Sequence, residues 1–404
     1  MSMAWESVFN QIRRLDIVTP HGMSGTLARE SRYVFNYTTS TEESAVSLVM
    51  PIRQESYASG DLMGIFAMNR PEGYLRYIIE ERLKRLGVPS EMFLLYLAGS
   101  NQIGRLTYTL AGQPLSGVNG EQLTTLLRSP STALFQHLVD RYALGSGISG
   151  VQPKTLVPLI PSSLLDIHTS LPLATVIVKA EGLDFPCIAR NEYLCLLVAK
   201  TAGLDVPDFW LSDDGLLFIM SRFDRRADGT AIGFEDMAVL TGRNSARKYE
   251  GSYEMIAKAV SIFAGEDAVK QNYRLFERVA LSCKLRDGDA HLKNFGMVYD
   301  HPLAARKLAP VYDVVCTDIY PELDGKLALK LNKSKTFPIR ANLLAYGVRL
   351  GLSYSDAEQV LKRLDDAFEQ VCDALKDDQR YRKDALLTRI KNAVYAADKG
   401  RGLN

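Results

Sequence analysis

The feature that most constrains this chain is a set of polar residues in its C-terminal half. Asp289 and Asn294 stand five residues apart, and Asp313 follows a further apolar run. Phosphoryl transfer from ATP uses such a set: a carboxylate that orients the attacking hydroxyl and accepts its proton, an amide oxygen on one Mg²⁺, and a carboxylate that bridges the metals. We expect Asp289, Asn294 and Asp313 to take these roles in that order. By itself, the Asp-Gly pair at 287–288 is equally compatible with a turn between two strands, because Asp-Gly is a common hairpin signal.

A glycine-rich loop lies upstream, in the sequence Gly145-Ser-Gly-Ile-Ser-Gly-Val-Gln-Pro-Lys154, and precedes an expected strand at 155–159. Glycines let the backbone approach a ligand closely, so that its N–H groups can bind phosphate oxygens. The loop lacks the Walker A sequence, and a glycine-rich stretch by itself is more often a flexible linker. An apolar strand at 174–179 ends in Lys179, where protein kinases hold the lysine that pairs with the α- and β-phosphates. Such a lysine can otherwise be a solvated strand end.

Two further segments complete an ordered series. Residues 218–221 form an apolar strand that runs directly into the charged segment Arg222–Arg225, which suits a hinge whose backbone meets adenine. A helix with Glu192 lies between the lysine and this hinge. Glycine loop, lysine, glutamate helix, hinge, and then Asp, Asn and Asp follow the order of parts in a protein kinase. The shared order favours a kinase far more than any one of these signals does.

Composition argues against several other classes of protein. The 48 Lys+Arg residues against 47 Asp+Glu residues leave a net charge of +1, so no overall charge directs the 404-residue chain to nucleic acid or to an acidic membrane. The five cysteines are scattered without a Cys-x-x-Cys pair, which argues against a disulfide scaffold or a zinc ribbon and is typical of thiols in a reducing cytosol. No signal peptide and no membrane-spanning run is expected. The five histidines share no ligand spacing, so no structural metal site is expected.

Changes in local pattern divide the chain into three parts of an α+β protein. Residues 1–118 mix short β-rich pieces with turns and a helical stretch. Residues 119–225 contain the glycine loop, the lysine strand and the hinge. Residues 226–404 are mainly helical.

Several local elements are specific enough to test. Strands are expected at 33–37 and 45–50, and a helix is expected at 73–86. Asn191 is expected to cap the helix that follows it. Ser355-Asp-Ala-Glu358 is expected to be a capping box. The helix after it carries the apolar stripe Val360, Leu361, Leu364, Phe368 and Val371.

Taken together, these residues resemble the HipA-type serine/threonine kinases, toxins of bacterial toxin–antitoxin modules. The resemblance covers nearly the full length. It rests on Val46–Pro51, Asn69–Gly73, Ile148–Lys154, Asn191–Cys195, Arg222–Arg225, Asp289–Asn294 and Tyr312-Asp313, of which the last four segments are the most specific. It implies a HipA-like protein-kinase fold, with an N-terminal α+β subdomain, a small kinase lobe and an all-α C-terminal lobe. It also implies Mg-ATP-dependent phosphorylation of a serine or threonine in a protein.

The resemblance assigns roles to particular residues. It makes Asp289 the catalytic base, and it makes Asn294 and Asp313 the Mg²⁺ ligands. It makes Lys179 the phosphate lysine and Tyr312 a wall of the nucleotide pocket. Further ATP contacts are implied at the hinge residues Ser221 and Phe223, at the loop residues Ser149, Gly150, Val151, Gln152 and Lys154, and at His291 and Lys293.

The glycine loop departs from the family at one position. In family members a loop serine is autophosphorylated, which expels the loop and inactivates the kinase, but the position most often used is Gly147 here. Ser149 matches the second serine of a subgroup with a Ser-Ile-Ser loop, so we expect autophosphorylation there, with Ser146 or no loop serine as alternatives. Ser149 can equally be a loop hydroxyl that bonds its own backbone. Asp287 is expected to be a turn residue rather than a supporting acid.

The resemblance also implies partners. Family members phosphorylate aminoacyl-tRNA synthetases, so the expected substrate is a cytoplasmic protein of this kind, alone or with bound tRNA. A small helix-turn-helix antitoxin, and operator DNA through that antitoxin, are also expected. Two alternatives stay open: a small-molecule phosphotransferase, which shares the Asp-x4-Asn spacing, and a catalytically weak pseudokinase regulator. A non-enzymatic DNA-binding repressor is disfavoured because the sequence has no evident basic helix.

Overall fold

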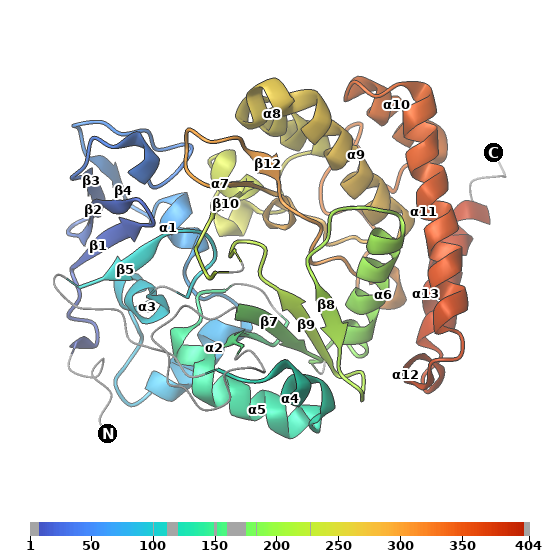
Figure 1. Ribbon diagram of the computed structural model, residues 1–404, viewed down its shortest axis with the longest axis horizontal. Coiled ribbons are helices and arrows are strands. Elements are labelled where there is room, and N and C mark those ends of the chain that lie inside the picture. Colours follow the sequence, from blue (N-terminus) through green and yellow to red (C-terminus); the bar gives the residue numbers. More distant parts are fainter. Residues whose placement is uncertain are drawn as a thin grey trace. The chain divides into compact units, whose positions relative to one another are not determined.

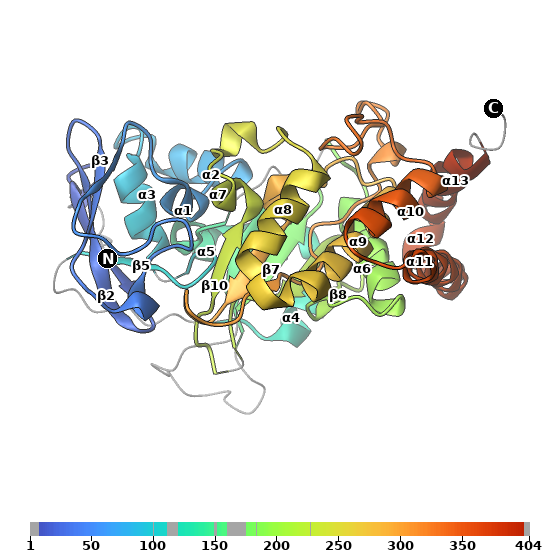
Figure 2. The same ribbon diagram turned by 90° about the horizontal axis from the view of Figure 1, so that it is seen from above.

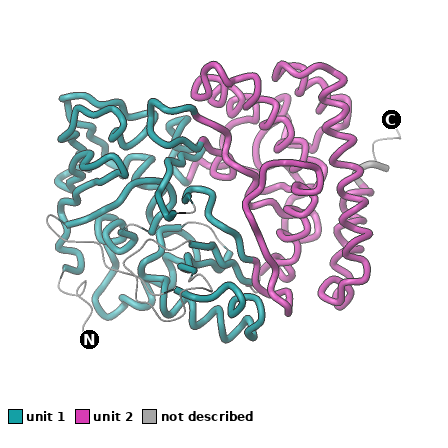
Figure 3. The backbone as a smooth tube through the Cα atoms, in the orientation of Figure 1, with its two compact units in different colours: residues 1–180, 219–245, 298–305 teal, residues 181–218, 246–297, 306–404 magenta. Residues whose placement is uncertain are grey.

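The computed structural model describes residues 8–99, 101–110, 120–148, 152–159, 175–182, 184–226 and 228–399. The chain divides into two units (Figure 3). Unit 1 comprises residues 1–180, 219–245 and 298–305, and unit 2 comprises residues 181–218, 246–297 and 306–404. Each unit is therefore built from segments that are separated in the sequence.

Unit 1 contains a five-stranded antiparallel sheet in the order β4-β3-β2-β1-β5 (Figure 2). Its strands are β1 (Arg14–Thr19), β2 (Gly22–Arg29), β3 (Tyr33–Tyr37), β4 (Tyr57–Ser59) and β5 (Thr107–Thr109). Leu15, Leu27 and Phe35 lie opposite one another on β1, β2 and β3, and all three are fully buried. This row fixes the register, because a shift by one residue would turn a strand's apolar side chains to the other face.

Unit 1 also contains helices. They are α1 (Gly64–Met68), α2 (Tyr74–Leu83), α3 (Glu91–Ala98), α4 (Leu123–Arg128), α5 (Ser131–Tyr142) and α7 (Met237–Leu240) (Figure 1). The hydroxyl of Ser90 caps α3 by accepting a hydrogen bond of 3.2 Å from the N–H of Phe93. α3 then packs against β1 and β5 with Phe93 fully buried.

Further strands of unit 1 carry the lysine and hinge segments. β6 (Lys154–Pro158) and β7 (Thr175–Ala180) are antiparallel. β9 (Leu217–Ser221) follows β7 in the sheet order, and its last three residues belong to unit 1. β10 (Gly233–Asp236) is next to β11 (Gly296–Tyr299), whose last two residues belong to the same unit.

Unit 2 is mainly helical. Its helices are α6 (Ile188–Thr201), α8 (Tyr253–Ala264), α9 (Ala268–Lys284), α10 (Arg340–Arg349), α11 (Tyr354–Leu375), α12 (Gln379–Arg382) and α13 (Leu386–Lys399), and its short strands are β8 (Phe209–Leu211) and β12 (Lys307–Leu308). α11 packs on both α6 and α9, and α8 packs on α9. The expected stripe on α11 is buried: Val360, Leu361, Leu364, Phe368 and Val371 are each at most 5% exposed.

Some local predictions are confirmed and others are wrong. The strand expected at 33–37 is β3, and the helix expected at 73–86 is α2. The apolar run at 45–50 forms turns with an isolated bridge and no strand, because Ser47 and the N–H of Leu48 bond the carboxylate of Glu235 instead of a neighbouring strand.

Both capping predictions were also wrong in detail. α6 begins at Ile188 after Cys187, so Asn191 lies inside the first turn. The cap of α11 is Ser353, whose hydroxyl accepts from the N–H of Asp356 at 3.0 Å. Among the helices within the described ranges, none is both long enough and apolar enough to cross a membrane.

Candidate active site

The segment that follows α9 forms a tight loop that presents Asp289. The chain reverses at Arg286, which has a positive φ of 59°, and the N–H of Asp287 returns to the carbonyl of Ser282 at 2.8 Å. Gly288 is required here, because a Cβ at this position would lie 2.5 Å from the carbonyl oxygen of Lys326. The Asp-Gly pair therefore belongs to a loop between α9 and the segment that contains Asp289, and it is no hairpin turn between strands.

Asp289 is held from both sides. Its N–H donates to Asp287 Oδ1 at 3.1 Å, and its carbonyl accepts from the N–H of His291 at 2.7 Å. The hydroxyl of Tyr249 donates to Asp289 Oδ1 at 2.7 Å. A hydrogen bond from a hydroxyl to one oxygen of a carboxylate restricts the rotamer of the acid. Asp289 is thus presented as an oriented carboxylate, as a base for a substrate hydroxyl requires.

Asp287 is a buried supporting acid, and the prediction that it is only a turn residue was wrong. It is fully buried, with Oδ1 accepting from the N–H of Asp289 and Oδ2 accepting from Ser282 Oγ at 3.2 Å. Burial raises the pKa of Asp287 to about 7, while the charge of Arg278 opposes this and that of Asp289 adds to it. Its side chain therefore sets the backbone position of the residue two places later.

Asn294 and Asp313 are brought together, as expected for two ligands of one metal. The Nδ2 of Asn294 donates to the backbone carbonyl of Asp313 at 3.1 Å. Asp313 has a positive φ of 56°, a conformation that Asp tolerates better than most residues. Asn294 is only 3% exposed, and its Oδ1 has no hydrogen-bond partner among the described residues. A buried carbonyl oxygen without a partner is costly unless something else binds it, and Mg²⁺ prefers oxygen ligands of this kind.

Two side chains beside this pair brace the backbone. The hydroxyl of Tyr312 donates to the carbonyl of Lys293 at 2.7 Å, and Arg278 donates to the carbonyl of Tyr312 at 2.7 Å. Tyr312 therefore links the segment that contains Asn294 to the segment that contains Asp313. These contacts fix the separation of the two expected ligands through the main chain.

His291 is a neutral, buried ring beside Asp289. It is 6% exposed and packs edge-to-face on Tyr249, with ring centroids 5.0 Å apart. Burial, together with the positive charge of Lys248, lowers the pKa of His291 to about 3. A neutral imidazole contributes no positive charge to the site. Its Nδ1 has no partner within the described part of the chain.

Unit 1 places two expected phosphate lysines opposite each other. Lys154 on β6 pairs in register with Lys179 on β7, and the residues are 6% and 3% exposed. Gln152 lies at the entrance to β6, where its Nε2 donates to the carbonyl of Ala180 at 3.3 Å. Lys154, Lys179 and Gln152 therefore lie together where β6 begins and β7 ends.

The glycine loop itself is only partly described. Ser149, Gly150 and Val151 lie outside the described residues. Ser146 is fully buried, donates to the carbonyl of Tyr142 at 2.9 Å and accepts from the N–H of Leu156 at 3.2 Å. These contacts make Ser146 a structural hydroxyl that no kinase can reach while the unit is folded.

Gly147, at the family's usual serine position, has no room for a side chain. A Cβ there would lie 2.6 Å from Gln102 Cβ and 2.8 Å from the carbonyl oxygen of Asn69. The N–H of Gly147 also donates to the carbonyl of Asn101 at 3.0 Å. This chain therefore packs the start of its loop against residues 69 and 101–102, and only glycine fits.

The hinge segment of unit 1 contains a buried ion-pair cluster. Arg222 donates to both carboxylate oxygens of Asp224 and to the carbonyl of Gln102, and Arg225 donates to Asp224 and to the carbonyls of Gln102 and Gly104. Asp224 is 1% exposed; burial alone would raise its pKa, but the charges of Arg222 and Arg225 hold the pKa below its usual value. The segment Arg222–Arg225 is thus bonded to the backbone of residues 102 and 104.

The two hinge residues expected at the adenine flank this cluster. Ser221 ends β9 and is half-buried. Phe223 is half-buried and packs edge-to-face on Phe234, with ring centroids 5.3 Å apart. Their contact with adenine stays a prediction.

Sequence reasoning missed Tyr249 altogether. It lies 40 residues before Asp289 in an irregular segment, where no motif or periodicity distinguishes it. The supporting role of Asp287 was weighed and set aside, because the Asp-Gly signal for a turn outweighed it.

Comparison with known proteins now decides the family. Residues 146–374 match the HipA-like C-terminal domain, and residues 15–109 match the HipA N-terminal domain. The chain belongs to the HipA family. Its C-terminal match includes Asp289, Asn294 and Asp313, and it begins at Ser146 in the glycine loop.

HipA-family relatives with kinase names match part of this chain. A candidate kinase of Haemophilus influenzae is 29% identical over 46% of the chain and 57% of its own length. The candidate kinases Y4dM and Y4mE of Sinorhizobium fredii are 30% and 32% identical over 39% and 49% of the chain, and over 41% and 49% of their own lengths. The matched stretch therefore spans about half the length of these curated relatives.

A solved HipA structure shows the same fold. HipA of Shewanella oneidensis, solved with HipB and operator DNA, aligns over 95% of this chain and 96% of its own, with a TM-score of 0.71 and 18% sequence identity. The α+β, HipA-like fold that the sequence resemblance implied is confirmed. The division into residues 1–118, 119–225 and 226–404 stays a prediction.

Proposed function

We propose that this HipA-family protein is a Mg-ATP-dependent kinase that phosphorylates a serine or threonine of a protein. The observation that carries the proposal is the pairing of Asn294 with Asp313 close to the oriented carboxylate of Asp289. Asn294 Oδ1 is buried without a partner among the described residues, and its amide is fixed to the backbone of Asp313. Chains built only for structure seldom leave such an oxygen unsatisfied.

In this proposal Asp289 acts as the base. It is positioned to accept the proton of the substrate hydroxyl as that oxygen attacks the γ-phosphorus of ATP and the bond to the β-phosphate oxygen breaks. Tyr249 donates to one oxygen of Asp289 and so fixes the orientation of the carboxylate. Asp287 fixes the backbone beneath it.

The residues present fit a magnesium ion. Asn294 and Asp313 would hold it, and Mg²⁺ when bound would neutralise charge on the β- and γ-phosphates. In the ranges that the structure describes, no three His, Cys, Asp or Glu side chains cluster around a metal site. Two protein ligands are ordinary for Mg²⁺ in kinases, because phosphate oxygens and water complete its shell.

Several other residues are proposed to contact ATP. In unit 1, Lys154 and Lys179, opposite each other on β6 and β7, would bind phosphate oxygens, with Gln152 beside them. Ser221 and Phe223 would contact adenine. His291, Lys293 and Tyr312 are also proposed as ATP contacts, as are the loop residues Ser149, Gly150 and Val151. Ser149 is also the proposed site of self-inactivating autophosphorylation, since Ser146 is buried and residue 147 is glycine.

The biological setting is proposed from the family. The solved Shewanella HipA is in complex with HipB and operator DNA, so we propose a comparable helix-turn-helix antitoxin, and DNA through it, as partners of this chain. A translation component such as an aminoacyl-tRNA synthetase is the proposed substrate. The cytoplasm, where such a substrate and ATP occur, is the proposed location.

The test is transfer of labelled γ-phosphate in a cell lysate. Wild-type protein with Mg-ATP is expected to label a small number of proteins, and Asp289→Asn is expected to label none while keeping its circular dichroism spectrum. Label on metabolites rather than proteins would replace the proposal with a small-molecule phosphotransferase. Equal labelling by Asp289→Asn would remove Asp289 from the reaction.

A further inference from the structure

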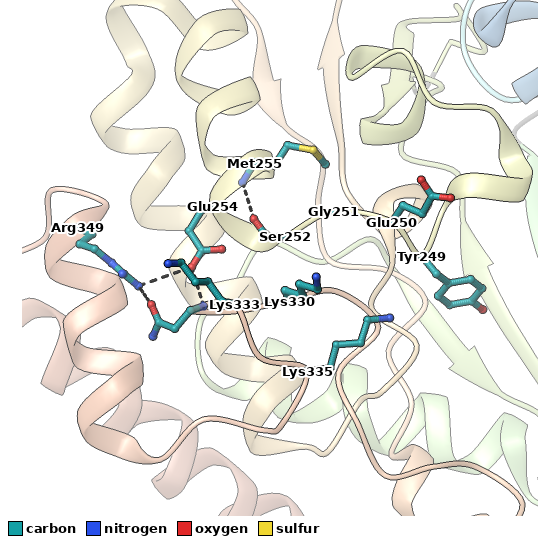
Figure 4. A pocket seen from close by; sticks show the side chains of 11 residues that line it. Tyr249, Glu250, Gly251, Ser252, Glu254, Met255, Lys330, Lys333, Lys335 and Arg349 are labelled. Atoms are coloured by element: carbon teal, nitrogen blue, oxygen red, sulfur yellow. Dashed lines mark hydrogen bonds and ion pairs between the residues drawn. The ribbon is translucent and has the colours of Figure 1, made fainter.

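Unit 2 contains a cavity whose lining is unusually rich in lysine. The cavity has a volume of about 1080 Å³. Lys330, Lys333, Lys335 and Arg349 line it, against only two acidic residues, Glu250 and Glu254 (Figure 4). Tyr249 lines the same cavity.

The three lysines that line this cavity, called the groove below, are not neutralised by neighbouring acids. In the part of the chain that the structure describes, no carboxylate forms an ion pair with Lys330, Lys333 or Lys335. Glu254 is instead engaged by Arg349 at 3.7 Å, and its Oε1 accepts from the N–H of Asn332 at 2.8 Å. The groove therefore keeps a local excess of positive charge in a protein whose net charge is only +1.

A rigid hairpin presents these lysines. Leu331 and Ser334 exchange two backbone hydrogen bonds of 2.8 and 3.1 Å around the two-residue turn Asn332-Lys333. Lys330 is fastened next to α8, since its N–H donates to Gly251 and its carbonyl accepts from the N–H of Tyr253. A surface that is held so firmly loses little conformational entropy when it binds a partner.

Lys333 occupies a strained backbone conformation. Its φ is +67° and that of Asn332 is +52°. Two-residue turns of this kind favour Asn followed by Gly, because a side chain at the second position crowds the carbonyl. A lysine held there at a conformational cost, inside a cationic groove, points to a role in binding.

Tyr249 connects the groove to Asp289, the proposed base. The ring of Tyr249 lines the groove, and its hydroxyl lies 2.7 Å from Asp289 Oδ1. A chain segment bound along the lysines can therefore continue to Asp289 within a few residues. The side chains of Lys330 and Lys335 project into the space between Tyr249 and the hairpin turn (Figure 4).

We propose that this groove binds an acidic segment of the protein substrate that flanks the phosphorylated hydroxyl. The inference rests on the proposed kinase function and deepens it by naming the chemistry of the substrate. A peptide fits better than a nucleic acid, because single-stranded nucleic acid is usually bound on several stacked aromatic rings, and Tyr249 is the one aromatic residue among those that line the cavity. Aspartate or glutamate side chains would meet the three lysines.

Binding is tested first, without catalysis. Fluorescence anisotropy of a labelled peptide with an Asp-rich flank is compared with that of an Asn-rich peptide and of an RNA oligonucleotide of equal length. We expect only the Asp-rich peptide to bind, with affinity falling about fivefold to tenfold in the double variant Lys330→Ala/Lys335→Ala. Binding of RNA in preference to the peptide, or of neither, would overturn the proposal.

Two further variants separate charge from folding. Lys333→Gly removes a charge and relieves the turn, so its melting temperature is expected to hold or rise while peptide affinity falls. Lys258→Ala/Lys270→Ala removes two exposed lysines from α8 and α9 and is expected to bind like wild type. Equal losses in this control and in the groove variant would assign the effect to overall charge.

The catalytic comparison distinguishes this proposal from the proposed function. Wild type is expected to phosphorylate the Asp-rich peptide with a higher kcat/KM than the Asn-rich one, and the ratio is expected to fall in Lys330→Ala/Lys335→Ala. Phosphorylation of both peptides equally would refute the groove proposal and keep the kinase. Phosphorylation of neither, with the Asp-rich peptide still bound, would refute the peptide-kinase activity and keep the groove.

Discussion

Replacing Asp287 by asparagine is expected to change how stability depends on pH. The folded carboxyl has a pKa of about 7 against an ordinary value of 3.8, because the side chain is fully buried. Between these values the folded state holds a proton that the unfolded chain has lost, so the free energy of unfolding falls as pH rises. The loss is absent below the unfolded pKa and complete above the folded one. The amide introduced by Asp287→Asn does not titrate; its oxygen would still accept from the N–H of Asp289, and its NH2 group would donate to Ser282 Oγ.

The magnitude follows from the width of that window. From pH 5 to pH 7, about two pH units, the folded carboxyl largely keeps a proton that the unfolded chain has lost. At 1.36 kcal/mol per unit, the free energy of unfolding of the wild type falls by about 3 kcal/mol over this range, and that of Asp287→Asn does not. Urea unfolding at pH 5 and pH 8, followed by circular dichroism, measures the difference. The free energy of unfolding of Asp287→Asn, taken relative to wild type, is expected to be higher at pH 8 than at pH 5 by this amount.

A matched control isolates the buried group. Glu266→Gln removes an exposed carboxylate in the 3-10 turn before α9 and is expected to leave the pH dependence as in wild type. The reasoning is refuted if the difference between Asp287→Asn and wild type is the same at both pH values. Such a result would mean that the carboxyl is ionised throughout, with Arg278 as its counter-charge.

Three other predictions concern the site. Asp313→Ala is expected to weaken Mg-ATP binding at least tenfold in calorimetry, because a metal ligand acts before the reaction as well as during it; unchanged affinity would remove it from the metal shell. Gly147→Ser is expected to lower the free energy of unfolding by about 1–3 kcal/mol, since its Cβ would meet the Asn69 carbonyl, and to gain no phosphate by intact mass. Tyr249→Phe is expected to lower kcat about tenfold through a less oriented Asp289, with the KM for ATP unchanged; a higher kcat would show that the hydroxyl competes with substrate.

The sequence predicted best where chemistry is local. The strand at 33–37 was predicted from its tyrosine, valine and phenylalanine residues, which are typical of strands, and it is β3. The helix at 73–86 was also predicted from local pattern, and it is α2. The roles of Asp289, Asn294 and Asp313 stay predictions, and the structure places the carbonyl of Asp313 3.1 Å from the Asn294 amide.

Three of the failures share one physical cause, which is contact with distant residues. Asn191 has the preference of a helix cap, yet its amide group pairs with the backbone N–H and carbonyl of Cys316, 125 residues away. The apolar run at 45–50 has strand composition, yet Glu235 holds it in turns from 187 and 188 positions away. Tyr249 reaches Asp289 through a loop with no periodic signal. Local propensity cannot anticipate such partners, because tertiary contacts outweigh it.

The buried cluster of Arg222, Asp224 and Arg225 bears on how such a gene can evolve. Its cations are satisfied partly by carbonyls of residues 102 and 104, which lie more than a hundred positions earlier in the chain. If the N-terminal portion were encoded as a separate polypeptide, the later portion would expose two arginines against one aspartate, and the N-terminal portion would expose carbonyls without their donors, so both would fold well only after reassociating through this same cluster. Gene fission is therefore feasible only for pairs that are always co-expressed, and recombination between relatives is expected to exchange the two segments together.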